Sequence, residues 1–185
     1  MKVIGDRISV IKKEGLLSIV ILPTTDKKKL GLMMLWLMAW TICGLIVLAN
    51  YFKVQDQSSK LFIIVYLSFW AYYEFKISRA FIWKKWGKEK LWVQKGILHY
   101  QREIQKKGKV KEYNIDLIND LKLIETNDNN FSDFIGQSFW IKGGERIELS
   151  YQAKTISFGM QLKTEEANII LKEIQEIILK ILDKR

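Results

Sequence analysis

One uninterrupted apolar run constrains this chain more than any other feature. Residues 30–52, LGLMMLWLMAWTICGLIVLANYF, contain no charged side chain. An α-helix rises about 1.5 Å per residue and the hydrocarbon core of a bilayer is about 30 Å thick, so a run of this length can cross a membrane. A buried helix of a soluble protein is the less favoured alternative. The sequence therefore predicts a transmembrane helix over residues 30–52.

A second apolar run begins at residue 61 and is interrupted near its end by charge. The segment WAYYEFKISRAFIW, residues 70–83, contains Glu74, Lys76 and Arg79. The run is long enough to span only if it continues to about residue 83. Lys76 and Arg79 lie close in angle on a helix, and their long side chains can reach the headgroups. We therefore expect a second span over 61–83, completing a transmembrane hairpin over 30–83, with Lys76 and Arg79 as anchors.

Glu74 and three tryptophans are the expected packing residues inside the membrane: Trp36, Trp40, Trp70 and Glu74. Trp40 and Trp70 lie deeper than the headgroup level at which tryptophan collects, which favours packing between helices or against a partner. An intramembrane carboxylate needs a partner. By depth, Trp36 faces Glu74 and its indole N–H is one candidate donor. Protonation of Glu74 and a cation from a partner subunit are the alternatives.

The positive charge is concentrated at the two ends of this hairpin. The formal net charge is +10, and lysine and arginine dominate residues 1–29 and 76–109, whereas the connector 53–60 is short. Positive segments are retained in the cytoplasm during insertion, so we expect an inner-membrane protein with two spans and both termini cytoplasmic. No motif supports nucleic-acid binding. Cations near anionic lipid attract it, and the predicted lipid contacts are Lys76, Arg79, Lys84, Lys85, Lys88, Lys106, Lys107 and Lys109.

Outside the hairpin the pattern is that of antiparallel strands. The region 1–26 predicts a β-hairpin with strands over 7–12 and 16–22 and a turn at Gly15. Strands are also expected at 89–95, 97–105 and 109–115, and in LKLIET, ERIELSY and KTISFGM, where apolar and polar residues alternate. Both groups lie on the same side of the membrane, so the N-terminal hairpin can join the sheet of the later domain.

The period changes to that of a helix after Thr164, the expected N-cap. Aliphatic residues repeat at helical spacing through 164–184, which predicts an amphipathic helix packed on the sheet. Residues 87–185 are thus expected to form one α+β domain with an antiparallel sheet or barrel closed by this helix.

Several segments resemble a known group of proteins. The stretches ISVIKKEGLLSIVILPT, GKEKLWVQKG, KVKEYNIDLINDLKL and GGERIELSYQAKTISFGMQLKTEEANIIL are similar to those of small, largely uncharacterised Bacteroidota membrane proteins. The resemblance implies a two-helix membrane hairpin with a pleckstrin-homology-like cytoplasmic domain, and no catalytic residues. The layout is also similar, more faintly, to the photosystem I assembly protein of plastids and cyanobacteria.

No residue pattern indicates catalysis, a cofactor or a metal. His99 and Cys43 have no neighbours in sequence that suggest a catalytic or metal site, and the loop NDNNFSD lacks the spacing of a calcium-binding loop. We therefore expect a non-enzymatic scaffold or accessory subunit, whose helices dock in a membrane complex or a homo-oligomer and whose β-domain binds a protein partner. The alternatives are a module that binds anionic membrane lipids and an assembly factor for a membrane complex.

Overall fold

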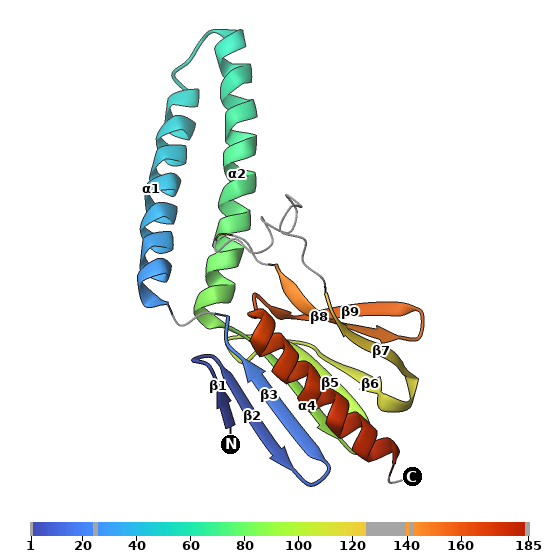
Figure 1. Cartoon of the computed structure of the whole chain (residues 1–185). Coiled ribbons are helices and arrows are strands. Elements are labelled where there is room, and N and C mark those ends of the chain that lie inside the picture. Colours follow the sequence, from blue (N-terminus) through green and yellow to red (C-terminus); the bar gives the residue numbers. More distant parts are fainter. Residues whose placement is uncertain (1, 24–25, 125–139, 141–142, 184–185) are drawn as a thin grey trace.

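Two long helices stand apart from a β-rich domain in the computed structural model, which describes residues 2–23, 26–124, 140 and 143–183 (Figure 1). Helix α1 spans Lys27–Tyr51 and α2 spans Gln57–Trp86, and the two form an antiparallel hairpin. Each begins at an aspartate cap. Asp26 accepts from the Lys29 N–H at 3.0 Å, and Asp56 accepts from the Ser59 N–H at 2.7 Å. Helix α1 therefore begins before the predicted 30–52 and ends one residue short of it, whereas α2 extends beyond the predicted 61–83 at both ends.

The apolar side chains of the hairpin are largely uncovered. In the most apolar window of each helix, 17% of the α1 residues and 0% of the α2 residues are buried. In a core helix of a soluble protein, by contrast, most of these residues would be buried. Both helices are long and apolar enough to cross a membrane.

The larger sheet has six antiparallel strands in chain order. They are β1 (Lys2–Ile4), β2 (Ile8–Lys13), β3 (Leu16–Ile21), β4 (Gly87–Gln94), β5 (Ile97–Ile104) and β6 (Val110–Asn114). Strand β3 pairs with β4 along its whole length, from Leu16 opposite Gln94 to Ile21 opposite Glu89. The N-terminal strands thus belong to the same sheet as those that follow the helices, and the hairpin is inserted between two neighbouring strands.

A second antiparallel sheet follows the 3₁₀ turn Ile115–Leu117. It contains β7 (Ile118–Leu123), β8 (Glu145–Tyr151) and β9 (Lys154–Met160) in that order. The prediction of an α+β fold with antiparallel strands is confirmed, whereas a closed barrel is wrong. Among the described residues, no strand pairing joins the two sheets, so the edges of β6 and β9 do not complete a ladder.

Helix α4 (Thr164–Leu182) packs against β3, β7 and β8 and covers one opening between the sheets. Its residues Ile170 and Ile174 are fully buried with Ile19, Leu149 and Phe158 in the shared core. The N-cap is Lys163, one residue before the predicted Thr164. The Glu166 carboxylate accepts the Lys163 backbone N–H at 2.9 Å, which satisfies a free donor of the first turn.

Candidate functional site

The two membrane-length helices meet where a small residue faces a ring. A Cβ on Gly44 would lie 1.9 Å from Cε2 of Trp70, so only glycine leaves room for this indole. The Trp70 Nε1–H donates to the carbonyl oxygen of Trp40 at 3.0 Å. A ring that packs closely against one helix and bonds its backbone fixes the register of the hairpin.

Glu74 finds its partner on α1, but the partner is not the one considered from the sequence. Thr41 Oγ1 lies 2.8 Å from Glu74 Oε1 and 2.8 Å from the Leu37 carbonyl oxygen, so the two acceptors share its single hydroxyl hydrogen. Trp36 instead stacks on Trp40, with ring centroids 5.2 Å apart. The second carboxylate oxygen of Glu74 is buried, without a hydrogen-bond partner among the described residues.

Three of the predicted lipid contacts project from the surface of α2. Lys76 and Arg79 are exposed, and the Lys76 ammonium lies 5.4 Å from the Tyr72 ring centroid. Lys85 is also exposed and lies over the Trp86 ring at 4.5 Å. These positions suit cations that reach along an apolar helix toward a polar layer.

Lys84 does not belong to this exposed set. Only 4% of its surface is accessible, and its ammonium donates to Gln161 Oε1 at 2.8 Å. The prediction of Lys84 as a lipid contact is therefore wrong, because this face of the last turn of α2 lies against the β-domain. From the sequence alone, a lysine at the end of a helix that enters a sheet can be exposed or buried. Only the packing of the helix end decides which.

Lys88 is also engaged within the protein. Its ammonium lies 2.9 Å from Glu103 Oε1, and Lys90 bonds the other oxygen of the same carboxylate. Hydrogen bonds from these two lysines hold the pKa of Glu103 below its ordinary value. Lys88 therefore contributes to a sheet-surface ion network, and less to a free cationic surface than the sequence suggested.

A basic turn lies beside the end of α2. Gly87 pairs with Ile104, and the Gln105 N–H donates to the Trp86 carbonyl at 3.4 Å. The turn after β5 contains Lys106 and Lys107, both exposed, and Lys109 follows. The last turn of α2, which contains Lys85, and this basic turn therefore lie next to each other. Figure 1 shows that α2 enters the β-domain at this end.

A buried carboxylate joins the two sheets at this same end. Glu89 on β4 is 2% exposed and accepts four hydrogen bonds. The donors are Tyr100 Oη at 2.7 Å, Arg102 Nε at 3.2 Å, Gly159 N at 2.9 Å and Met160 N at 3.0 Å. Burial, and then the Glu89 charge, raise the pKa of Tyr100, so its hydroxyl stays protonated and donates.

Arg102 extends the network across the space between the sheets. Its Nη2 donates to Glu145 Oε1 at 2.8 Å and to the Ser157 carbonyl at 3.2 Å. Sequence analysis did not identify Glu89 or Arg102. A signal was present, because Glu89 alternates with Leu91 and Val93 on the buried face of β4. A glutamate on the core face of a strand indicates a buried ion pair.

A cavity of about 840 Å³ lies at the junction of α2 with the smaller sheet. Its lining combines aromatic side chains with cations, as well as Ile77, Glu145 and Met160. The aromatic residues are Tyr72, Tyr73, Phe75 and Trp140, and the cations are Lys76, Arg79 and Arg102. A cavity with an apolar wall and clustered cations suits an anionic amphiphile.

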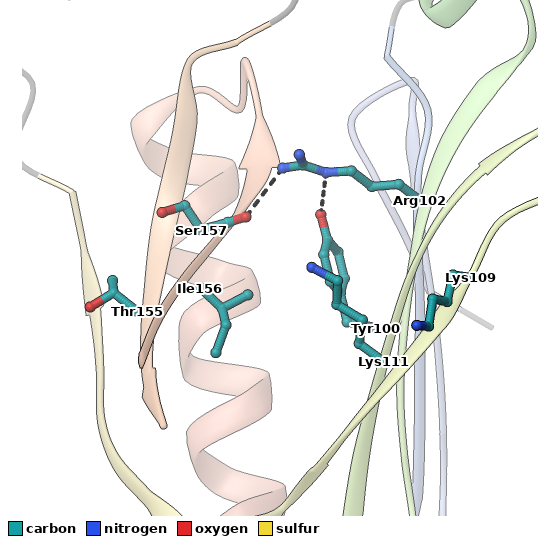
Figure 2. A pocket seen from close by; sticks show the side chains of 7 residues that line it. All are labelled: Tyr100, Arg102, Lys109, Lys111, Thr155, Ile156 and Ser157. Atoms are coloured by element: carbon teal, nitrogen blue, oxygen red, sulfur yellow. Dashed lines mark hydrogen bonds between the residues drawn. The ribbon is translucent and has the colours of Figure 1, made fainter. Parts of the chain in front are cut away.

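A smaller cavity of about 360 Å³ lies between β5 and β6 on one side and β9 on the other (Figure 2). It is lined by Tyr100, Arg102, Lys109, Lys111, Thr155, Ile156 and Ser157. Arg102 therefore borders both cavities, and its guanidinium is held by the Glu89 network between them.

His99 and Cys43 are the remaining candidates considered from the sequence. His99 stacks on Trp92 with centroids 4.9 Å apart, and its Nδ1 lies 3.5 Å from an oxygen of Glu112. Cys43 is exposed on α1. Within the described part of the chain, no three histidine, cysteine or acidic side chains are placed to hold a metal ion. The predicted loop NDNNFSD lies outside the described residues.

The chain matches no protein-family model, no curated protein and no solved structure.

Proposed function

We propose that this chain is a non-enzymatic integral membrane protein that binds an anionic lipid where α2 enters the β-domain. The cavity of about 840 Å³ carries this proposal. Tyr72, Tyr73 and Phe75 provide an apolar wall for acyl chains, and Lys76 and Arg79 provide charge for a phosphate. Along α2 the aromatic residues come first and the cations follow. In a phospholipid the acyl chains are likewise followed by the phosphate, so one molecule can contact both surfaces.

Charge placement supports the orientation. The β-domain and both chain ends lie at the same end of the hairpin (Figure 1). Lys27 and Lys28 begin α1, Lys85 is in the last turn of α2, and the turn with Lys106 and Lys107 lies beside that end of α2. We propose that it is the cytoplasmic end, in the inner membrane. Each lysine or arginine near an anionic leaflet then adds roughly 1 kcal/mol of attraction. The lipid headgroup would lie between the membrane surface and the β-domain.

The test measures which lipids remain bound to the full chain. The protein is extracted in mild detergent from membranes that contain phosphatidylglycerol and phosphatidylethanolamine, and the bound lipids are quantified by mass spectrometry. The wild type retains phosphatidylglycerol in excess of its share of the membrane. The Lys76→Gln/Arg79→Gln variant loses this enrichment. The matched control is Lys53→Gln/Lys60→Gln, which removes the same charge at the other end of the hairpin and keeps the enrichment.

Equal phosphatidylglycerol content in the wild type and the Lys76→Gln/Arg79→Gln variant would overturn the proposal. The basic turn provides a second arm. Lys106→Glu/Lys107→Glu weakens the enrichment at low salt, and this effect of the substitutions becomes smaller as salt is added, because exposed charges are screened. A loss that does not depend on salt would argue against attraction to a charged surface.

A docking role for the hairpin is a second candidate, favoured by the uncovered rings of α2. Phe62, Phe69 and Phe75 are 74%, 63% and 63% exposed. Rings in such number suit helix packing in a membrane complex or a homo-oligomer, as in a scaffold, accessory subunit or assembly factor. Crosslinking in the native membrane tests this. Recovery of only uncrosslinked monomer would contradict it.

A pleckstrin-homology-like assignment is part of the same proposal. Two antiparallel sheets with a C-terminal helix over one opening support it. In this arrangement the β-domain could also bind a protein partner at the cytoplasmic surface.

A further inference from the structure

We propose that the seam between β6 and β9 is a binding site for a small phosphate-bearing anion, distinct from the lipid cavity at α2. The site is the cavity of about 360 Å³ in Figure 2, which lies where the two sheets fail to close into a barrel. A volume near 300 Å³ is at the lower end of small-ligand pockets. It therefore fits a phosphate monoester with a small organic group better than a folded partner.

The first argument is the direction of the lysines. Lys111 pairs directly with Tyr100, and Leu98 pairs with Tyr113. Paired residues of neighbouring strands point to the same face of a sheet, so Lys111 lies on the face that carries the buried Tyr100 and Tyr113. Lys109 lines the same cavity. The core face of β6 thus changes from aromatic to cationic where it borders the seam.

The second argument is that these charges are not compensated. Among the described residues, no ion pair joins Lys109 or Lys111 to a carboxylate. Arg102 is different, because Glu89 and Glu145 oppose its charge. Within the described residues, the hydrogen bonds of the Arg102 guanidinium come from Nε and Nη2, and none comes from Nη1. The cavity therefore has an excess of positive charge and a fixed donor.

The third argument is the backbone of β9. The Ser157 carbonyl accepts from Arg102, and the Gly159 N–H donates to Glu89, so this edge of β9 points at β4 and β5. In an antiparallel strand, the N–H and C=O groups of one residue point to the same edge of the strand, and those of the next residue point to the opposite edge. The N–H groups of Thr155 and Ser157 are therefore on the seam. Backbone N–H groups together with lysines are the donors that phosphate oxygens accept.

Inward-pointing charges at an edge strand also have a purely protective role, since they prevent pairing with another chain. That role predicts no saturable ligand. Isothermal titration calorimetry distinguishes a phosphate-binding site from a protective edge. The full chain is used in phosphatidylcholine nanodiscs at fixed ionic strength. Titrations with inorganic phosphate and with glycerol 3-phosphate are expected to saturate in the millimolar range or below. Chloride is expected to give no saturable binding and to displace neither ligand.

Lys109→Gln/Lys111→Gln is expected to raise the dissociation constant at least about tenfold, because each removes a charged hydrogen bond. The control Lys154→Gln removes an exposed lysine from β9 outside the cavity and leaves binding unchanged. Circular dichroism of each variant checks the fold. Absence of saturation in the wild type, or equal constants in all three proteins, would overturn the proposal and leave edge protection.

Two further arms distinguish the source of the phosphate. If the natural ligand is a lipid headgroup, nanodiscs with phosphatidylglycerol compete and raise the apparent constant for glycerol 3-phosphate. If it is a free metabolite, the constant is the same in both nanodiscs. In the Lys76→Gln/Arg79→Gln variant, phosphate binding at the seam is retained, so failure of the lipid proposal leaves this one intact. An acidic peptide that binds while phosphate and glycerol 3-phosphate do not would identify the seam as a strand-docking edge and overturn the assignment.

Discussion

Gly44 on α1 and Trp70 on α2 are in direct contact, and the ring occupies the space that any larger residue at position 44 would need. We expect Gly44→Ala to destabilise the hairpin by about 1–3 kcal/mol, as overpacking does. The ring must move, which also strains its bond to the Trp40 carbonyl. Thermal unfolding in detergent, followed by tryptophan fluorescence, measures the loss.

Gly31→Ala is the matched control for that change. Gly31 is in the same helix, and a Cβ there would meet no atom within 4 Å. Alanine is a better helix former by about 1 kcal/mol, so this variant is expected to be neutral or more stable. Equal destabilisation by both substitutions would show that the Trp70 contact is unimportant.

The Thr41–Glu74 hydrogen bond provides a second prediction. Thr41→Val removes the hydroxyl donor and is expected to destabilise the hairpin by about 0.6–1.7 kcal/mol. Glu74→Ala is expected to have a similar effect, and the double variant little more, because the two residues share one bond. Lys76→Ala serves as the control, since Lys76 is exposed. Additive effects of Thr41→Val and Glu74→Ala would contradict the coupling.

Glu89 is expected to be the most sensitive charged position of the β-domain. Glu89→Gln removes one of the two carboxylates that face the partly buried Arg102, leaving only Glu145, and places amide hydrogens toward backbone donors. Breaking a buried pair in this way costs about 3 kcal/mol. Urea unfolding of the detergent-solubilised chain measures the change. Glu112→Gln, at a carboxylate that is 65% exposed, is the control and is expected to change stability little.

Acid is expected to weaken the pairs between Glu103 and its two lysines. The folded pKa of Glu103 is lowered by Lys88 and Lys90, so its contribution is present above the unfolded pKa near 4.5. That contribution is lost as the pH falls through the lower, folded value. Urea midpoints at pH 7 and pH 3 should therefore differ less for Glu103→Gln than for the wild type. An unchanged difference would contradict this account.

Much of the architecture could be read from periodicity. Alternation in residues 89–95 and 97–105 predicted β4 and β5, because a strand with one buried face imposes a period of two. The run 30–52 predicted α1, because few structures other than a membrane helix use so long an apolar segment. Strand β1 was not predicted, since three residues are too few to show a period.

By itself, the sequence determined the helices, most strands, the position of the positive charge and the lack of a catalytic motif, because these depend on neighbouring residues. Only the tertiary structure decided that Thr41 bonds Glu74, that Lys84 is buried and that Glu89 joins two sheets through Arg102. It also decided that β6 and β9 leave a seam. These relationships join residues that are far apart along the chain. They depend on distance and burial in three dimensions, which a pattern of nearby letters does not contain.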